Sequence, residues 1–112
     1  MTASAFSVSV LVPASGFEVS AGNPVIGGLH GEIRHHHCDW CKGWLFTRPP
    51  DLPVVNVRAT LLDDHHWFAP FVETYTSEKL PWAQTGAPRS YARFPEMGEY
   101  STLIAEYQDR GA

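Results

Sequence analysis

The sequence predicts a mainly β domain that ends in one helix, and three observations support this fold class. The chain has 112 residues and a mass of 12.5 kDa, enough for one hydrophobic core, which excludes a multidomain enzyme. Nine glycines and nine prolines favour short strands and turns over long helices. A composition of 44% hydrophobic and 18% charged residues is ordinary for a globular protein, so disorder, collagen-like repeats and low-complexity sequence are poor explanations.

Short alternating segments near the N-terminus predict hairpins. Residues 6–12 carry Phe and Val at alternate positions, which is typical of a strand, and this strand is expected to end at Pro13. After a turn, residues 17–19 form a second predicted strand. Residues 25–26 add a third apolar step before a loop expected at the glycines 27–28.

The middle of the chain predicts three further strands. Residues 32–37 form the first of them and lead directly into Cys38. Residues 44–47 are bulky and residues 54–60 are rich in β-branched side chains, and the prolines 49–50 separate the two segments.

The last third of the chain combines a loop, a strand and a helix. Residues 63–66 are expected to form a polar loop, and residues 71–76 are rich in strand formers. Pro95 suits a first helical position, and apolar residues between 97 and 107 recur at helical spacing. One amphipathic helix is therefore expected to close the chain at Gly111.

Charge and hydropathy exclude two classes of partner. The chain has 8 Lys and Arg against 12 Asp and Glu, a net charge of -4 and a pI of about 5.8, so no overall positive field attracts a nucleic acid. The longest apolar runs, such as residues 8–14, are far shorter than the roughly 20 residues of a membrane helix. The N-terminus also lacks a basic segment followed by a long apolar one. We expect a cytoplasmic protein that binds neither nucleic acid nor membrane.

The segment from Cys38 to Gly43 is the most informative for function. Two cysteines cannot form a disulfide framework, but two thiolates three positions apart can bind one tetrahedral zinc ion. Gly43 is expected to permit the tight turn around the metal. Two buried free thiols, or a redox dithiol, are alternatives, although the helix start typical of a redox dithiol is absent. Zinc takes four ligands, so Cys38 and Cys41 need histidines, another chain or residues outside this sequence.

Histidines next to the cysteines are candidate ligands. His35, His36 and His37 directly precede Cys38, and neutral imidazole binds zinc. Because neighbouring strand residues point to opposite faces, at most His35 and His37 share a side, and a residue adjacent to Cys38 is poorly placed to close the same tetrahedron. The alternative is a half-exposed polar strand.

Other candidate sites are weaker. Asp63-Asp64-His65-His66 has the residue types of a metal site or an acid–base pair, but a solvated loop is the better explanation of the run. The aromatic residues at 67–82 are expected mainly in the core rather than around a pocket. The chain contains no G-x-S-x-G, G-x-G-x-x-G or P-loop motif, so nothing indicates a serine hydrolase or a nucleotide-binding protein. No catalytic residue is assigned.

Four segments, in order, carry a family resemblance. They are GGLHG at 27–31, CDWCKGWLFTRP at 38–49, VNVRATLLDD at 55–64 and ETYTSEKLPWA at 73–83. Phe94-Pro95, at the start of the expected helix, also fits. This succession resembles the glutathione-dependent formaldehyde-activating enzyme family, also called the CENP-V/GFA domain, over nearly the whole chain.

The resemblance implies a β-tent fold of stacked short antiparallel sheets, Zn2+ held by cysteines, and a carbon–sulfur lyase activity that condenses glutathione with formaldehyde. Glutathione or another small thiol is the implied partner. In the family, a late Cys-x-x-Cys joins an early Cys-x-Cys in a structural zinc site, and a Cys-x-Cys-x-x-Cys between them holds an open, catalytic zinc. Cys38 and Cys41 correspond to the late pair.

The chain departs from the family pattern because it contains only the late pair. Residues 1–6 resemble the family stretch that follows the catalytic trio, so the single domain 1–112 is expected to be N-terminally truncated, through a mis-assigned start, natural shortening or fragmentation. A zinc shared between two Cys38/Cys41 pairs in a homodimer is one expectation. Two functions remain open, a lyase completed by ligands from elsewhere and a catalytically inactive zinc-binding or interaction module.

Overall fold

A computed structural model describes residues 4–111, without the side chains of residues 28–30 and 111. Residues 1–3, part of the segment compared with the family, lie outside the described residues. The chain divides into two compact units, the first ending at Phe68 and the second beginning at Ala69. The described residues contain mostly short strands and a C-terminal α-helix, which confirms the predicted mainly β fold class.

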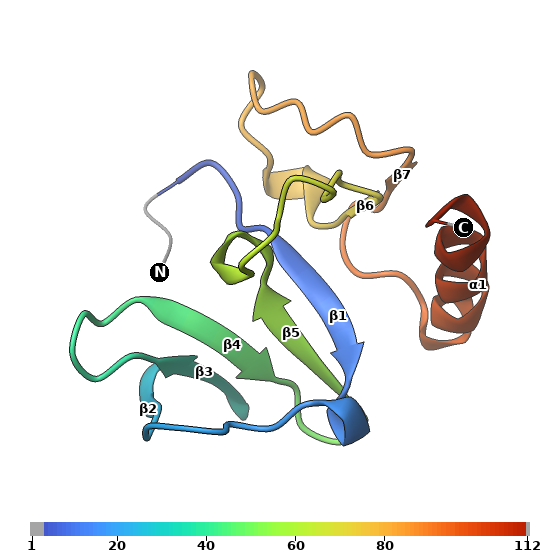
Figure 1. Cartoon of the computed structure of the whole chain (residues 1–112). Coiled ribbons are helices and arrows are strands. Elements are labelled where there is room, and N and C mark those ends of the chain that lie inside the picture. Colours follow the sequence, from blue (N-terminus) through green and yellow to red (C-terminus); the bar gives the residue numbers. More distant parts are fainter. Residues whose placement is uncertain (1–3, 112) are drawn as a thin grey trace. The chain divides into compact units, whose positions relative to one another are not determined.

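The described part of the first unit is built on a five-stranded sheet (Figure 1). Its spatial order is β1-β5-β4-β3-β2, and every neighbouring pair is antiparallel. The strands are β1 (Ser9–Pro13), β2 (Val25–His30), β3 (Ile33–His37), β4 (Trp44–Arg48) and β5 (Val54–Arg58). Each turn between consecutive strands from β2 to β5 therefore connects neighbours in the sheet. The connection from β1 to β2 instead crosses the whole sheet, because these two strands lie at opposite edges.

The core of the first unit lies on the inner strands. Phe46 and Thr47 of β4 and Val55 of β5 are buried, and Val55 has no exposed surface. Phe17 packs on Phe46 with ring centroids 4.8 Å apart. An inner strand has a neighbour on each side, so its side chains lose more exposed surface than those of an edge strand. The edge strand β1 alternates half-buried and exposed residues, as its sequence predicts.

Two predicted features of the N-terminal region are wrong. Residues 17–19 form no strand, because β1 pairs with β5 instead of with the segment that follows it. The loop expected at residues 27–28 is absent, because β2 runs through both glycines to His30.

Gly27 marks an irregularity in the pairing of β2 with β3. The register shifts between Ile26 and Gly28, which leaves Gly27 as the extra residue of a β-bulge. A Cβ atom at Gly27 would lie 2.5 Å from Nδ1 of His37. The strand therefore needs glycine at this position because its backbone lies against the His37 ring.

The described part of the second unit contains a small sheet and the helix. Strands β6 (Val72–Glu73) and β7 (Arg89–Ser90) pair in parallel. The expectation that all sheets are antiparallel is therefore confirmed for the first sheet and wrong for this one. The strand expected over residues 71–76 is cut to two residues, because Tyr75 takes a left-handed conformation and a 3₁₀ turn follows it.

Helix α1 (Tyr100–Gly111) starts later than the sequence suggests. Pro95 is not its first residue, because residues 97–99 form a 3₁₀ turn before it. Leu103 is buried on the helix, whereas Ile104 and Tyr107 are each 44% exposed, so the predicted apolar face is only partly covered. Among the described residues, no helix combines the length and the hydropathy needed to cross a membrane.

The aromatic residues at 67–82 are less buried than expected. Trp67 is 50% exposed and Trp82 is 70% exposed. Phe71 instead packs against Tyr107 of α1, at 5.5 Å between ring centroids, and Tyr75 packs edge-on against Phe94 at 4.8 Å. The prediction that this stretch lies mainly in the core is wrong for both tryptophans.

Glu73 joins the strands and loops of the second unit through its carboxylate. Thr85 Oγ1 donates a hydrogen bond to one oxygen at 2.6 Å, Ser90 Oγ donates to the other at 2.7 Å, and Lys79 Nζ lies 3.6 Å away. The hydrogen bonds from Thr85 and Ser90 and the charge of Lys79 lower the pKa of Glu73, against a smaller opposing effect of desolvation.

The lowered pKa of Glu73 predicts that part of the free energy of unfolding is lost in acid. The unfolded chain binds a proton at Glu73 more readily than the folded chain, so stability is lost as the pH falls from the ordinary glutamate value through the lower folded value. We expect thermal unfolding of Glu73→Gln to respond less to acidification between pH 6 and pH 3 than that of the wild type, with the exposed Glu78→Gln as control. Identical pH profiles of wild type and Glu73→Gln would contradict this.

The β-bulge at Gly27 predicts a steric clash when a side chain is added there, and removal of the His37 ring should relieve this clash. Gly27→Ala places a methyl group against the His37 ring and should destabilise the fold by about 1–3 kcal/mol in urea unfolding. In the double variant Gly27→Ala/His37→Ala the clash disappears, so the two costs should not add. Strictly additive effects would show that the close approach has no energetic consequence.

Candidate metal site

Cys38 and Cys41 lie in the turn that joins β3 to β4, which we call the cysteine turn (residues 38–43). The Cys38 N–H donates to the Gly43 carbonyl at 2.9 Å, and the Lys42 N–H donates to the Cys38 carbonyl at 2.8 Å. These bonds close the turn and hold both cysteines on it. Cys38 is half-buried, Cys41 is exposed, and both thiols are free of a disulfide.

The turn surrounds the Cys38 sulfur with hydrogen-bond donors. The backbone N–H groups of Cys41 and Trp40, followed by the Cys41 thiol, lower the pKa of the Cys38 thiol. Desolvation and the Asp39 carboxylate act in the opposite direction but are weaker. Because these donors stabilise a thiolate, they favour the form of cysteine that binds a metal.

The residue that makes the tight turn is Lys42, so the expectation that Gly43 does so is wrong. Lys42 has a φ of 63°, in the left-handed region, and Gly43 has no positive φ. A Cβ atom at Gly43 would lie 3.4 Å from the Cys41 sulfur, which is an ordinary van der Waals contact. Lys42 Nζ also forms an exposed ion pair with Asp39 Oδ1 at 2.8 Å, which lowers the pKa of Asp39.

The buried histidine of β3 takes part in packing. His35 is 5% exposed, and its Nδ1 is hydrogen-bonded to Thr47 Oγ1 at 2.7 Å. Trp44 Nε1 donates to the same oxygen at 3.0 Å, and the Trp44 ring lies edge-on to His35 at 5.1 Å. This network links β3 to β4 from inside the sheet.

The other two histidines of β3 are also in contact with their neighbours. His36 stacks on Phe46 at 4.5 Å, and burial, followed by the charges of Arg48 and Arg34, lowers its pKa. His37 Nδ1 donates to the His35 carbonyl at 3.3 Å. Among the described residues, no group of three or more His, Cys, Asp or Glu side chains is arranged to hold a metal. The structure therefore brings the two cysteines together without a histidine that completes their site.

Residues elsewhere in the chain offer little to the cysteine turn. His30 pairs with Ile33 in the backbone register, which places it at the end of β3 away from Cys38, roughly 15 Å along the strand. The sequence from Ala69 onward contains neither cysteine nor histidine. The cysteine turn thus supplies two ligands of the type that zinc prefers.

The second predicted cluster forms a local turn. His65 Nδ1 donates to the Leu62 carbonyl at 3.3 Å, and the His66 N–H donates to Asp64 Oδ1 at 3.3 Å. Trp67 Nε1 donates to the Asp64 carbonyl at 2.7 Å. These contacts are made within the loop, as expected of a solvated polar segment.

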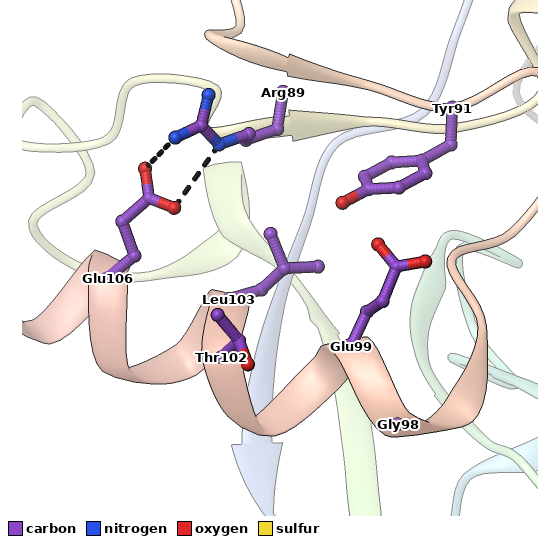
Figure 2. A pocket seen from close by; sticks show the side chains of 7 residues that line it. All are labelled: Arg89, Tyr91, Gly98, Glu99, Thr102, Leu103 and Glu106. Atoms are coloured by element: carbon purple, nitrogen blue, oxygen red, sulfur yellow. Dashed lines mark hydrogen bonds and ion pairs between the residues drawn. The ribbon is translucent and has the colours of Figure 1, made fainter.

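A shallow hollow in the second unit was not indicated by the sequence analysis. Arg89 binds both carboxylate oxygens of Glu106, at 3.2 and 2.6 Å, and the Tyr91 hydroxyl points toward Glu99 (Figure 2). Desolvation, followed by the hydrogen bond and charge of Glu99, raises the pKa of Tyr91. The seven-residue spacing of Glu99, in the 3₁₀ turn, and Glu106, in α1, was the available signal in the sequence. The lining residues are Arg89, Tyr91, Gly98, Glu99, Thr102, Leu103 and Glu106.

The left-handed conformation of Lys42 predicts that glycine at this position is more favourable than alanine. This conformation costs an L-residue with a side chain about 1 kcal/mol, and it costs glycine little. The free energy of unfolding of Lys42→Gly should therefore exceed that of Lys42→Ala by up to about 1 kcal/mol. Both variants lose the ion pair with Asp39, so urea unfolding of the pair isolates the backbone effect. Equal stability of the two variants would contradict the left-handed assignment.

The closed backbone of the cysteine turn holds both thiols on one turn, and the lowered pKa of Cys38 favours its thiolate form. Comparison of the chain with protein-family models, curated proteins and solved structures found no match.

Proposed function

We propose that the chain is a zinc-binding module in which Cys38 and Cys41 provide two of four zinc ligands. The observation that carries the proposal is the closed backbone of the cysteine turn, in which hydrogen bonds from Cys38 N–H to the Gly43 carbonyl and from Lys42 N–H to the Cys38 carbonyl hold both cysteines on one turn. Zinc is bound well by thiolates in tetrahedral geometry, and two cysteines on one tight turn are a common half of such a site.

The position of the turn favours zinc over a redox dithiol. A redox-active pair with this spacing draws its low thiol pKa from the start of a helix, whereas Cys38 and Cys41 connect two strands. Zinc bound there would tie the ends of β3 and β4 together. Its binding free energy would then contribute directly to folding.

The resemblance to the glutathione-dependent formaldehyde-activating family supports the same assignment. Cys38 and Cys41 correspond to the family's late pair, which belongs to a structural zinc site. A structural role for the zinc fits this turn, because the neighbouring residues His35 and Trp44 are both hydrogen-bonded to Thr47 in the packed sheet. Under this proposal the chain keeps the family's scaffold and the late half of its structural site.

A carbon–sulfur lyase that joins glutathione to a small aldehyde is the second candidate. It is favoured by the order of the family segments along the sequence, from 27–31 to 73–83. It also requires a catalytic zinc, and the described residues contain no group of three ligands to hold one. The ligands of such a zinc would therefore come from outside the described residues.

Zinc should stabilise the fold through both cysteines. We expect added Zn2+ to raise the unfolding temperature of the reduced protein and a chelator to reverse the rise, because a ligand that binds only the folded state stabilises it. Cys38→Ser and Cys41→Ser should each lose this response. His65→Ala, in the separate loop, should keep it. Unfolding temperatures that are the same with zinc and with chelator would overturn the proposal.

The two candidate functions differ in turnover. The zinc-loaded chain, mixed with glutathione and formaldehyde, should not accelerate adduct formation beyond the uncatalysed rate measured by NMR. A chelator-sensitive acceleration that is absent from Cys38→Ser would instead establish the lyase.

A further inference from the structure

We infer that two copies of this chain share a single zinc ion, each copy giving Cys38 and Cys41. The inference rests on the proposed zinc binding and names its partner, a second copy of the chain. It adds a statement about stoichiometry and assembly that zinc binding alone does not require.

The number of ligands is the first argument. Zinc in structural sites is four-coordinate, and the cysteine turn supplies two thiolates. In the described part of the chain no third His, Cys, Asp or Glu is gathered with them. His30, whose side chain is not described, lies at the opposite end of β3 in the backbone register. A second cysteine turn supplies the two missing thiolates with the same geometry.

The exposure of the turn is the second argument. The turn extends beyond the ends of β3 and β4 (Figure 1). Cys41 is exposed, and Trp40 between the two cysteines is 92% exposed. The side chains of Asp39 and Lys42 are 71% and 69% exposed. A second copy can therefore approach both sulfur atoms.

The surface of the turn is the third argument, because it is self-complementary. Asp39, between the two cysteines, and Lys42, directly after Cys41, carry opposite charges and form an exposed ion pair at 2.8 Å. A copy related by a two-fold axis can place its Lys42 toward Asp39 and its Asp39 toward Lys42. A large exposed aromatic such as Trp40 provides the apolar area that interfaces between chains favour.

Titration of the reduced, metal-free chain with Zn2+ tests the inference. Native mass spectrometry should show one zinc per two chains, and sedimentation should show twice the 12.5 kDa chain mass, returning to monomer with chelator. One zinc on a monomer would overturn the sharing and leave the proposed zinc binding intact. A dimer that persists in chelator would also overturn the sharing, and a chain that binds no zinc would overturn both proposals.

Variants of the turn separate ligation from folding. Cys38→Ser and Cys41→Ser should stay monomeric at every zinc concentration, with circular dichroism confirming that they are folded. His65→Ala keeps both thiols and every residue of the cysteine turn, so it should still dimerise. Trp40→Ala should raise the dimer dissociation constant by about tenfold, as expected for one interface aromatic. Substitution by Co2+ adds a spectroscopic readout, because the thiolate charge-transfer absorption of four sulfurs is about double that of two, and the two-sulfur intensity would contradict a shared site.

Discussion

The pairing of β3 with β4 is the interaction on which the rest of the first unit depends. It places His35 opposite Thr47, where their side chains are hydrogen-bonded at 2.7 Å, and it places His36 opposite Phe46, on which its ring stacks. The same pairing brings Cys38 and Gly43 together across the turn, with a backbone bond of 2.9 Å. Core packing and the position of the thiols are therefore set by one ladder, and a change that shifts its register affects both.

The sheet is irregular close to the cysteines. The β2–β3 register shifts at Gly27, and the β3–β4 register shifts between His36 and His37. Each bulge increases the local twist and re-aims the side chains beside it. On β3, His36 lies between the two irregularities and His37 lies between the second one and Cys38, so the strand enters the cysteine turn from a distorted rather than a regular end. For this reason, alternation along β3 alone does not predict the direction of each histidine side chain.

Much of the fold could be read from local pattern, and the remainder depends on contacts between distant segments. Alternation predicts β1, and β-branched residues predict β5, but nothing local indicates that these two strands pair. The glycines at 27–28 suggest a turn, yet Gly27 is required because the His37 ring occupies the space of a side chain. The spacing of Cys38 and Cys41 predicts the candidate metal site. That Lys42 adopts the left-handed conformation next to a glycine is a property of the folded turn and has no signal in composition.

The crossover of β1 has a consequence for folding during synthesis. Strands β2 to β5 each pair with the strand before or after them in sequence, so their hairpins can close as they leave the ribosome. Strand β1 is synthesised before them but can pair only after its partner β5 (Val54–Arg58) has been synthesised. Until then the backbone N–H and C=O groups of β1, which carries Val10, Leu11 and Val12, have no partner strand. The N-terminal strand is thus the segment most open to pairing with another nascent chain, and the rate at which β5 is translated sets how long that exposure lasts.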